Sequence, residues 1–234
     1  MIVNPKNMKP FVSILTPTYN RRIFIQQYLK ILRQQDYRGK IEIIIADDSD
    51  EPVNDLLGND EIIKYHYFNE KKSLGFKRNF LAEEARGDIL IHIDDDDYYP
   101  PERISHAVEI LQKNNTLIAG SSQCFFYNTI KDEITISGPF GKNHGTAGTF
   151  AYFKDYINDH HFNNNDWAQE EPAFTKNFTI PMTQLDPRKT MIVIWHKNNT
   201  WDKSKSAMRP TSLKLKDLNV DIQSRRFYKK LSGQ

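Results

Sequence analysis

The chain has 234 residues, enough for one domain with a sizeable core, and its 12% aromatic content excludes a disordered chain. Its 32 Lys and Arg residues nearly balance its 30 Asp and Glu residues, so the charge gives no support for nucleic-acid binding. A single cysteine excludes an internal disulfide and a zinc site built from several thiolates. No apolar run approaches the roughly 20 residues of a membrane span, and residues 1–10 lack the apolar core of a signal peptide. We therefore expect a soluble, cytoplasmic protein.

The first 115 residues alternate between strand patterns and helix patterns. Short apolar runs bounded by turn residues predict buried strands, which we place at Phe11–Thr16 (stopped by Pro17), Ile41–Ala46, Ile62–Phe68 and Ile89–Ile93. Apolar residues at helical spacing predict helices at Ile23–Gln35, at Lys77–Arg86, and from Pro101 to about Asn115. This order predicts an α/β protein, an αβα sandwich with a mostly parallel central sheet covered on both faces.

The second half of the chain is less regular. We expect strands at Leu117–Phe126, Ile134–Ile136 and Met191–Trp195, and a glycine-containing loop at Gly138–Gly148. The polar stretch His160–Glu171 is predicted to be a loop that leads into a helix. The predicted organisation is an N-terminal extension (1–10), a single domain (11–212, with halves 11–115 and 116–212) and a basic C-terminal tail (213–234).

The tail from Lys214 to Gln234 holds six basic and two acidic residues and permits two interpretations. The one we favour is that the tail packs on the domain or ends flexibly, with Leu215, Leu218, Ile222 and Phe227 supplying the apolar contacts. The other is peripheral contact with anionic lipid or with a protein partner, through Arg225, Arg226, Lys229 and Lys230.

Three predicted strands end in polar, mostly acidic residues: Thr16–Asn20, Asp47–Asp48 and Asp94–Asp97. Open α/β sheets bind ligands beyond the carboxyl ends of their strands. We therefore expect these three segments to converge on one site, and this convergence is the main indication of function.

The run Asp94–Asp97 has several explanations. The simplest is a solvated acidic turn, because Asp favours loop geometry. Two carboxylates about 5.5 Å apart repel by roughly 3 kcal/mol at an effective dielectric of 20, and a divalent cation would remove that repulsion. An EF-hand does not fit, because Tyr98 and Tyr99 stand where that loop needs a ligand and a glycine. The chain has neither a P-loop nor a GxGxxG motif, and the missing GxGxxG argues against a dinucleotide site. A phosphatase that forms an aspartyl-phosphate stays an open alternative.

Three stretches together resemble the GT-A fold glycosyltransferases of family 2. FVSILTPTYNR is similar to the family's first strand and nucleotide loop, and IEIIIADDS to its second strand with a base-reading Asp. SLGFKRNFLAEEARGDILIHIDDDDYYPPERI resembles the GxxRN helix, the Gly-Asp turn and the DxD strand. The resemblance is close from Phe11 to about Leu111 and weakens up to about Trp201. It implies a GT-A (Rossmann-like) fold and transfer of a sugar from a nucleotide donor, expected to be a UDP-sugar, to an acceptor hydroxyl.

The resemblance also assigns roles on the donor side. Pro17, Thr18 and Tyr19 would line the nucleobase pocket, and Asp47 would accept a hydrogen bond from the base. Asp47 could instead cap a helix, as Asp48 or Ser49 could. Arg78 would approach the base or the phosphates, unless it lies on a solvated helix face. Asp95 would contact the ribose, and Asp94 would assist Asp95 or Asp96.

A metal and a base complete the implied chemistry. Asp96 would hold Mn²⁺ or Mg²⁺, which stabilises the leaving diphosphate as a Lewis acid, and His196 would be a late metal ligand or simply a hydrogen-bonded residue. An inverting reaction needs a base for the acceptor proton, and the family's acidic pair corresponds to Glu170-Glu171. We expect Glu171 to be the base, with Glu170 and Asp166 as alternatives, although acids at a helix start also have a macrodipole explanation.

On the acceptor side, aromatic faces suit sugar rings, and Trp167 is the expected contact, although tryptophans are more often core residues. The acceptor would be a glycan, a lipid-linked sugar or a protein side chain. Two other functions stay open. A nucleotidyltransferase that forms sugar nucleotides would need a glycine-rich phosphate loop, and TPTYNRR contains no glycine. A nucleotide-binding module without turnover is favoured only by the Glu-Glu pair.

Overall fold

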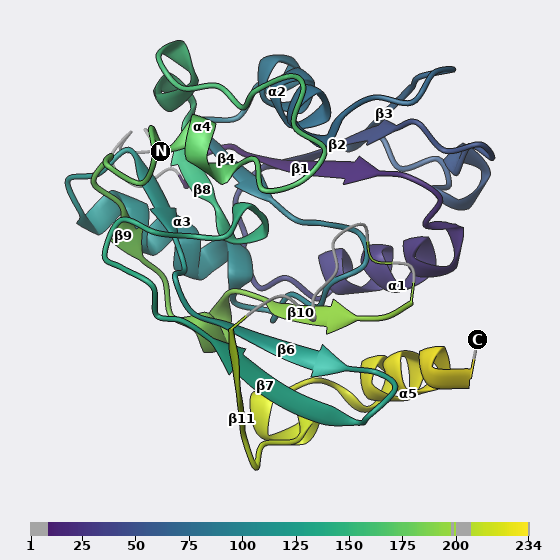
Figure 1. Cartoon of the computed structure of the whole chain (residues 1–234). Helices are drawn as coiled ribbons and strands as arrows, with labels where there is room; N and C mark the ends of the chain where they lie inside the picture. Colours follow the sequence, from purple (N-terminus) through teal and green to yellow (C-terminus); the bar gives the residue numbers. More distant parts are fainter. Residues whose placement is uncertain (1–8, 198, 200–206, 234) are drawn as a thin grey trace, which may run out of the picture.

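The computed structural model of the chain describes residues 9–197, 199 and 207–233. Most of the predicted N-terminal extension, and Trp201, lie outside these residues. The described chain forms a large sheet and a small sheet, with helices on both faces of the large one (Figure 1).

Seven strands form the large sheet in the order β3-β2-β1-β4-β8-β5-β9. β1 pairs in parallel with β2 and β4, and β2 pairs in parallel with β3, whereas β8 runs antiparallel to its neighbours β4 and β5. The expected mostly parallel α/β sheet is therefore confirmed. The bounds are β1 Val12–Thr18, β2 Ile41–Asp47, β3 Ile63–Tyr67, β4 Ile89–His92, β5 Ile118–Gly120, β8 Ala151–Phe153 and β9 Thr183–Gln184.

The apolar strands supply two cores because neighbouring side chains point to opposite faces. In β2, Ile43 and Ile45 join the core under α1 and α3, whereas Ile44 joins the core under α2 and α4. Each fully buried isoleucine stabilises the fold by about 2 kcal/mol relative to an exposed one.

The helices are α1 Arg22–Arg33, α2 Leu74–Glu84, α3 Arg103–Lys113, α4 Glu171–Phe174 and α5 Ile222–Lys230. The short 3₁₀ helices are η2 Asn54–Leu56, η3 Ala147–Thr149, η4 Lys154–Asn158, η5 Pro187–Lys189, η7 Leu215–Leu218 and η8 Leu231–Gly233.

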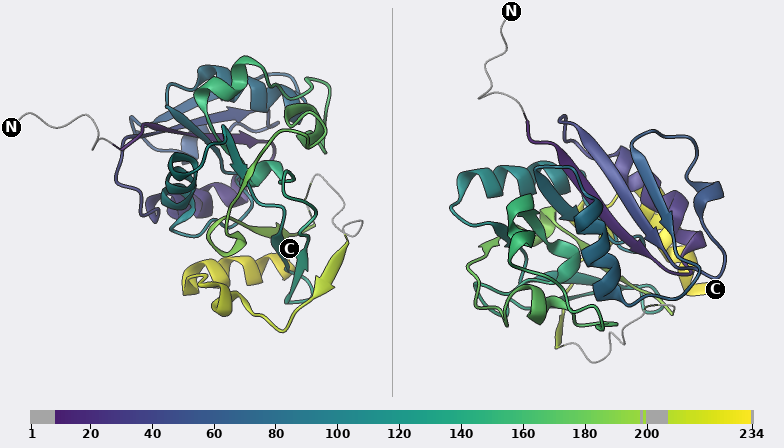
Figure 2. Two further views of the ribbon diagram at one scale, coloured as in Figure 1. Left: turned by 90° about the vertical axis from the view of Figure 1, so that its left-hand side faces the viewer. Right: turned by 90° about the horizontal axis from the view of Figure 1, so that it is seen from above.

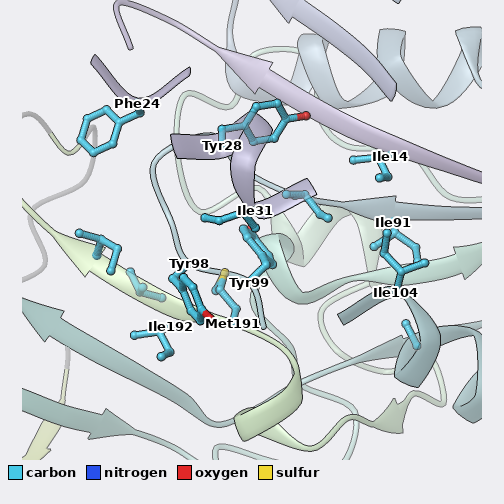
Figure 3. Close-up of a cluster of buried hydrophobic side chains, with 14 of the residues drawn as sticks. Ile14, Phe24, Tyr28, Ile31, Ile91, Tyr98, Tyr99, Ile104, Met191 and Ile192 are labelled. Atoms are coloured by element: carbon cyan, nitrogen blue, oxygen red, sulfur yellow. The ribbon is translucent and has the colours of Figure 1, made fainter. Parts of the chain in front are cut away.

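The small sheet has the order β10-β6-β7-β11 and docks on the acidic turn. Tyr98 and Ile192 exchange two backbone hydrogen bonds of 3.0 and 2.8 Å, and the Asp97 carboxylate accepts one from the Ile194 amide at 2.8 Å. Figure 3 shows the adjoining core, to which Phe24, Tyr28 and Ile31 of α1 and Tyr98, Tyr99 and Met191 contribute. The strands are β6 Cys124–Asn128, β7 Glu133–Ser137, β10 Ile192–Trp195 and β11 Met208–Pro210.

Several sequence-based boundaries are wrong, among them that of the second helix, which spans Leu74–Glu84 rather than Lys77–Arg86. The predicted strand Leu117–Phe126 is two strands, β5 and β6, which belong to different sheets. The chain bends between them, where the Ser121 hydroxyl donates to the Gln123 carbonyl at 2.7 Å. Pro17 does not end β1, which pairs with β2 as far as Thr18. The pairing of β1 with β4 ends at Leu15, so the missing N–H of Pro17 interrupts no hydrogen bond to β4. The third helix begins at Arg103 rather than at Pro101.

The C-terminal tail packs against the domain. Figure 1 and the left view of Figure 2 place α5 (yellow) at the bottom of the molecule, away from α2. Gln27 of α1 donates to the Ser224 hydroxyl at 2.6 Å, and Lys30 forms an ion pair with Asp221 at 2.7 Å. The expected burial of Leu215 and Leu218 is confirmed, whereas that of Ile222 is wrong, since this side chain is 54% exposed.

None of the helices in the described part of the chain combines the length and the apolar character that crossing a membrane would require.

Candidate active site

Two of the three strand exits that were expected to converge, those of β1 and β4, meet at a cavity of about 510 Å³, whereas Asp47 and Asp48 after β2 do not line it. The exits of β1 and β4, the start of α2, the loop before α4 and the segment around η3 all contribute to its wall. Asp47 and His196 are the two predicted site residues that do not line it. Those that do are Pro17, Thr18, Tyr19, Arg78, Asp94, Asp95, Asp96, Trp167, Glu170 and Glu171.

Arg78 connects three of the segments around this cavity. It is buried in α2, and its Nε donates to Glu170 at 2.7 Å, while its two terminal nitrogens lie 3.1 and 3.3 Å from the oxygens of Asp94. Burial alone would lower the pKa of Arg78, but Asp94 and Glu170 outweigh it and raise the pKa above its usual value. The Arg78 guanidinium therefore holds the acidic turn and the loop before α4 in place, and it is not on a solvated helix face.

The four aspartates have separate environments. Asp97 bonds to β10, as described above, and Asp94 bonds to Arg78. Asp95 is buried, and within the described residues neither its Oδ2 nor the buried hydroxyl of Thr18 makes a hydrogen bond of good geometry, although Thr18 is close enough to lower the pKa of Asp95. Burial, followed by the charge of Asp96, raises the pKa of Asp95 to about 8. Because an unpaired buried polar atom is costly, Asp95 and Thr18 mark a place where a ligand would supply the missing bonds.

Asp96 and His196 lie together, and their chemistry fits a divalent cation. His196 Nε2 is 3.1 Å from Asp96 Oδ2, and Arg21 and Asn199 are close to the same pair, at 3.2 and 3.0 Å. Within the described residues, no group of three or more His, Cys, Asp or Glu residues is arranged to hold a metal. One carboxylate and one imidazole are nevertheless sufficient on the protein side when a bound diphosphate and water supply the other ligands.

The loop before α4 is fixed by a close approach to α2. The Gly75 amide donates to the Asp166 carbonyl at 3.0 Å, and a Cβ at Gly75 would lie only 2.0 Å from the Asn163 carbonyl oxygen. Only glycine therefore permits this contact without a backbone shift. The contact keeps Asp166 in the loop and outside the cavity lining, where its carboxylate accepts from Asn163 at 3.0 Å.

Glu170 and Glu171 are adjacent but differ in what they contact. Glu170 is buried against Arg78, whereas Glu171 is only partly buried and accepts a hydrogen bond from the Ala147 amide at 3.0 Å. Burial, followed by the charge of Glu170, raises the pKa of Glu171 to about 7. A carboxyl group with this pKa can accept a proton near neutral pH, so of the pair Glu171 is the better placed to act as a base.

Asp47 does not face the cavity. Its carboxylate is fully buried and accepts three hydrogen bonds, from the amides of Ser49 (2.8 Å) and Val53 (3.0 Å) and from the Tyr65 hydroxyl (2.6 Å). All three bonds hold the loop that follows β2 against β3. The role of base reader that the resemblance gives to Asp47 is therefore not apparent in its contacts.

We expect Asp47→Ala to lower the free energy of unfolding by about 3 kcal/mol, because it leaves buried donors without an acceptor. Urea unfolding followed by fluorescence measures the change. Asp159→Ala, which removes an exposed carboxylate, is the matched control and should unfold like the parent. An Asp47→Ala protein of parental stability that had lost affinity for UDP would instead favour base reading.

Lys77 and Asp48 form a buried pair that was not predicted from the sequence. Lys77 Nζ donates to Asp48 at 2.6 Å and to the Thr18 carbonyl at 2.9 Å, and the second oxygen of Asp48 accepts from the Lys72 amide. Burial lowers the pKa of Lys77, although Asp48 opposes this shift. Through these bonds Lys77 joins the exits of β1 and β2. Lys77 also lines the cavity. Its position next to Arg78 in LGFKRN was the signal available in the sequence.

Trp167 lies beside the nucleotide loop. Its side chain is 53% exposed, and the ammonium of Lys71 lies 5.6 Å from the centre of its ring and 4.2 Å from that of Tyr19. One cation thus contacts both aromatic rings. Trp167 is therefore not a core residue and is close to the side of the cavity formed by Tyr19.

Residues 13–171 match the family described as Glycosyl transferase family 2. A relative from Campylobacter jejuni, named GalNAc(5)-diNAcBac-PP-undecaprenol beta-1,3-glucosyltransferase, is 33% identical over 113 residues, which are 45% of this chain and 35% of that protein. The chain spans about half or less of the length of the first curated relatives that it matches.

Two solved structures show the same fold at low sequence identity. S. aureus TarS in complex with UDP-GlcNAc is 18% identical, with a TM-score of 0.64 over 81% of this chain and 60% of that one. The mannosyltransferase PcManGT from Pyrobaculum calidifontis, in complex with GDP-Man and Mn²⁺, is 16% identical, with a TM-score of 0.65 over 83% of this chain and 59% of that one. Both are GT-A glycosyltransferases, so the expected GT-A fold is confirmed. With more than half of its length matched by the family, this chain belongs to Glycosyl transferase family 2.

Proposed function

We propose that this chain transfers a sugar from a nucleoside-diphosphate donor, expected to be a UDP-sugar, to an acceptor hydroxyl, with inversion and with the help of Mn²⁺ or Mg²⁺. The observation that carries the proposal is that one cavity is lined by Asp95, by Asp96 with His196 against it at 3.1 Å, and by a carboxyl group, Glu171, whose pKa is about 7. These are the groups that a metal-assisted sugar transfer needs at one place.

On the donor side, different residues would bind different parts of the nucleotide. Pro17 and Tyr19, which line the cavity, would contact the nucleobase, and Asp95 Oδ2 and the Thr18 hydroxyl would bond to the ribose. Asp96 and His196 would hold the cation, which when bound stabilises the charge on the leaving diphosphate. We place Trp167 on this donor side, because the Lys71 ammonium that contacts its ring also contacts Tyr19. This placement differs from the acceptor role expected from the sequence.

On the acceptor side, Glu171 takes the proton of the attacking hydroxyl. The acceptor oxygen forms a bond to the anomeric carbon on the face opposite the nucleotide, and the bond from that carbon to the phosphate oxygen breaks. The proton ends on Glu171 and the electron pair on the diphosphate. Glu170 forms an ion pair with Arg78 at 2.7 Å, and its charge contributes to the raised pKa of Glu171.

The test is a screen of UDP-sugars and GDP-sugars with Mn²⁺, in which the released nucleoside diphosphate is measured. We expect turnover of at least one donor, loss of that turnover with EDTA, and a decrease of roughly 100-fold or more in Asp96→Asn, since a Lewis acid supplies several kcal/mol. Asp155→Asn, an exposed carboxylate, is the control and should keep full activity.

Two outcomes of this screen would contradict the proposal. Nucleotide binding by calorimetry without turnover of any donor would indicate a binding module. Full metal-dependent activity in Asp96→Asn would show that the cation is held elsewhere.

A further inference from the structure

Three aromatic rings lie in a row at the wall of the cavity formed by the second half of the chain. The His144 ring lies between Phe140, at 4.9 Å between ring centres, and Phe178, at 4.4 Å with planes 22° apart. Phe140 and His144 line the cavity, and Phe140 is 57% exposed. We call these three residues the aromatic row. An exposed phenylalanine in a cavity wall leaves apolar surface that a ligand can cover.

The aromatic row is joined to the proposed base. His144 is three residues before Ala147, whose amide donates to Glu171. The backbone at His144 is held in place, because the Gln184 side chain donates to the carbonyls of Lys142 (2.8 Å) and His144 (2.9 Å). Since the acceptor hydroxyl must reach Glu171, the acceptor would lie next to this segment.

The backbone at Phe178 is strained. Lys176, Asn177 and Phe178 have φ angles of +47°, +57° and +60°, and left-handed backbone is uncommon for non-glycine residues and an outlier for bulky ones. Such conformations cost about 1–3 kcal/mol each and persist where the surroundings hold them. The Phe178 amide donates to the Thr175 hydroxyl at 3.1 Å, and its ring stacks on His144. The strained turn thus fixes the position of the His144 ring.

A proton on Nδ1 of His144 would be energetically costly. Its Nδ1 is buried and makes no hydrogen bond with the residues that the structure describes, and an unpaired N–H is costlier to bury than an unpaired lone pair. Burial also lowers the pKa of His144, which keeps the ring neutral at neutral pH. The single proton of the neutral ring therefore belongs on Nε2, which makes His144 a hydrogen-bond donor beside an aromatic face.

We propose that the aromatic row binds the acceptor and that the acceptor is a saccharide rather than a protein side chain. A pyranose ring has an apolar C–H face that packs on Phe140 and hydroxyls that accept from His144 Nε2. A serine or threonine side chain has no ring to cover Phe140. This inference rests on the proposed function and specifies its acceptor class.

The test uses the donor found in the screen, a panel of methyl glycosides as acceptors, and a serine- and threonine-containing peptide for contrast. Transfer to a glycoside is expected, and Phe140→Ala and His144→Ala should each raise the KM for that glycoside by roughly 10-fold, which corresponds to about 1.4 kcal/mol. Hydrolysis of the donor by water and the affinity for UDP should stay unchanged, because none of the described ring contacts of the aromatic row is with the nucleotide loop.

Ile130→Ala, which removes a side chain that is 60% exposed on a distant turn, is the matched control, and Phe140→Tyr should restore the KM. Thermal unfolding checks that each variant is folded. Wild-type KM values in folded Phe140→Ala and His144→Ala would overturn the inference, as would donor hydrolysis that the peptide accelerates and no glycoside does. Absence of donor hydrolysis in the parent protein would instead contradict the proposed function itself.

Discussion

Glu171→Gln is expected to lower the rate of sugar transfer by roughly 100- to 10,000-fold, the usual contribution of a general base. Glutamine keeps the shape of the side chain and can still accept from the Ala147 amide, but it cannot take a proton. The affinity for UDP should stay close to that of the parent, because no donor-side contact is removed. Steady-state transfer assays and calorimetry with UDP measure the two effects separately.

The pH dependence of the parent enzyme provides an independent check. The active form of Glu171 is the carboxylate, and its pKa is about 7, so the rate should rise with pH through that value and level off above it. Glu109→Gln, an exposed glutamate on α3, is the control and should be fully active. If Glu171→Gln lost UDP binding together with activity, Glu171 would be a structural residue rather than the base.

Arg78→Met is expected to lower the free energy of unfolding by about 3–5 kcal/mol and to abolish activity. The reason is that the change leaves Glu170 buried without its counter-charge and removes the partner of Asp94, and breaking a buried pair on one side is strongly destabilising. Urea unfolding monitored by fluorescence and by circular dichroism measures the loss.

Two further variants separate this explanation from a loss of packing. Arg22→Met removes an arginine that pairs with Asp55 at the surface, and surface pairs of this kind contribute little, so its unfolding midpoint should be that of the parent. The double variant Arg78→Met/Glu170→Gln should regain part of the lost stability, because the uncompensated carboxylate is gone. A double variant that is no more stable than Arg78→Met would show that packing, and not charge, explains the effect.

Local sequence patterns were sufficient to predict most strands and helices of the first half of the chain. The apolar runs around Ile14, Ile44 and Ile91 became strands because their side chains fill cores on both faces of the sheet, and this requires no knowledge of their neighbours. The second half depended on pairing. Whether Gly120 continues into Cys124 or the chain changes sheet is decided by contacts with β8, β9 and β7, which no local pattern contains.

The acidic residues also show which features local sequence predicts and which depend on tertiary contacts. Their presence at the strand exits was predictable, but only Asp94–Asp97 line the cavity, and Asp47 and Asp48 do not. Their individual tasks were not predictable, because Asp47 and Asp48 are neighbours that face different partners: Asp47 bonds to the loop after β2, and Asp48 bonds to Lys77. Arg78 could be named from its motif, but its two carboxylate partners are 16 and 92 residues away.

By itself, the sequence determined the α/β order, the acidic strand exits and the family, since each depends on short-range periodicity or on a contiguous motif. Only the tertiary structure decided which carboxylates are paired and which are unpaired, and that Phe140, His144 and Phe178 lie together. The physical reason is that pairing, burial and stacking depend on distances between segments that are far apart along the chain, and these distances exist only once the sheet and its helices have packed.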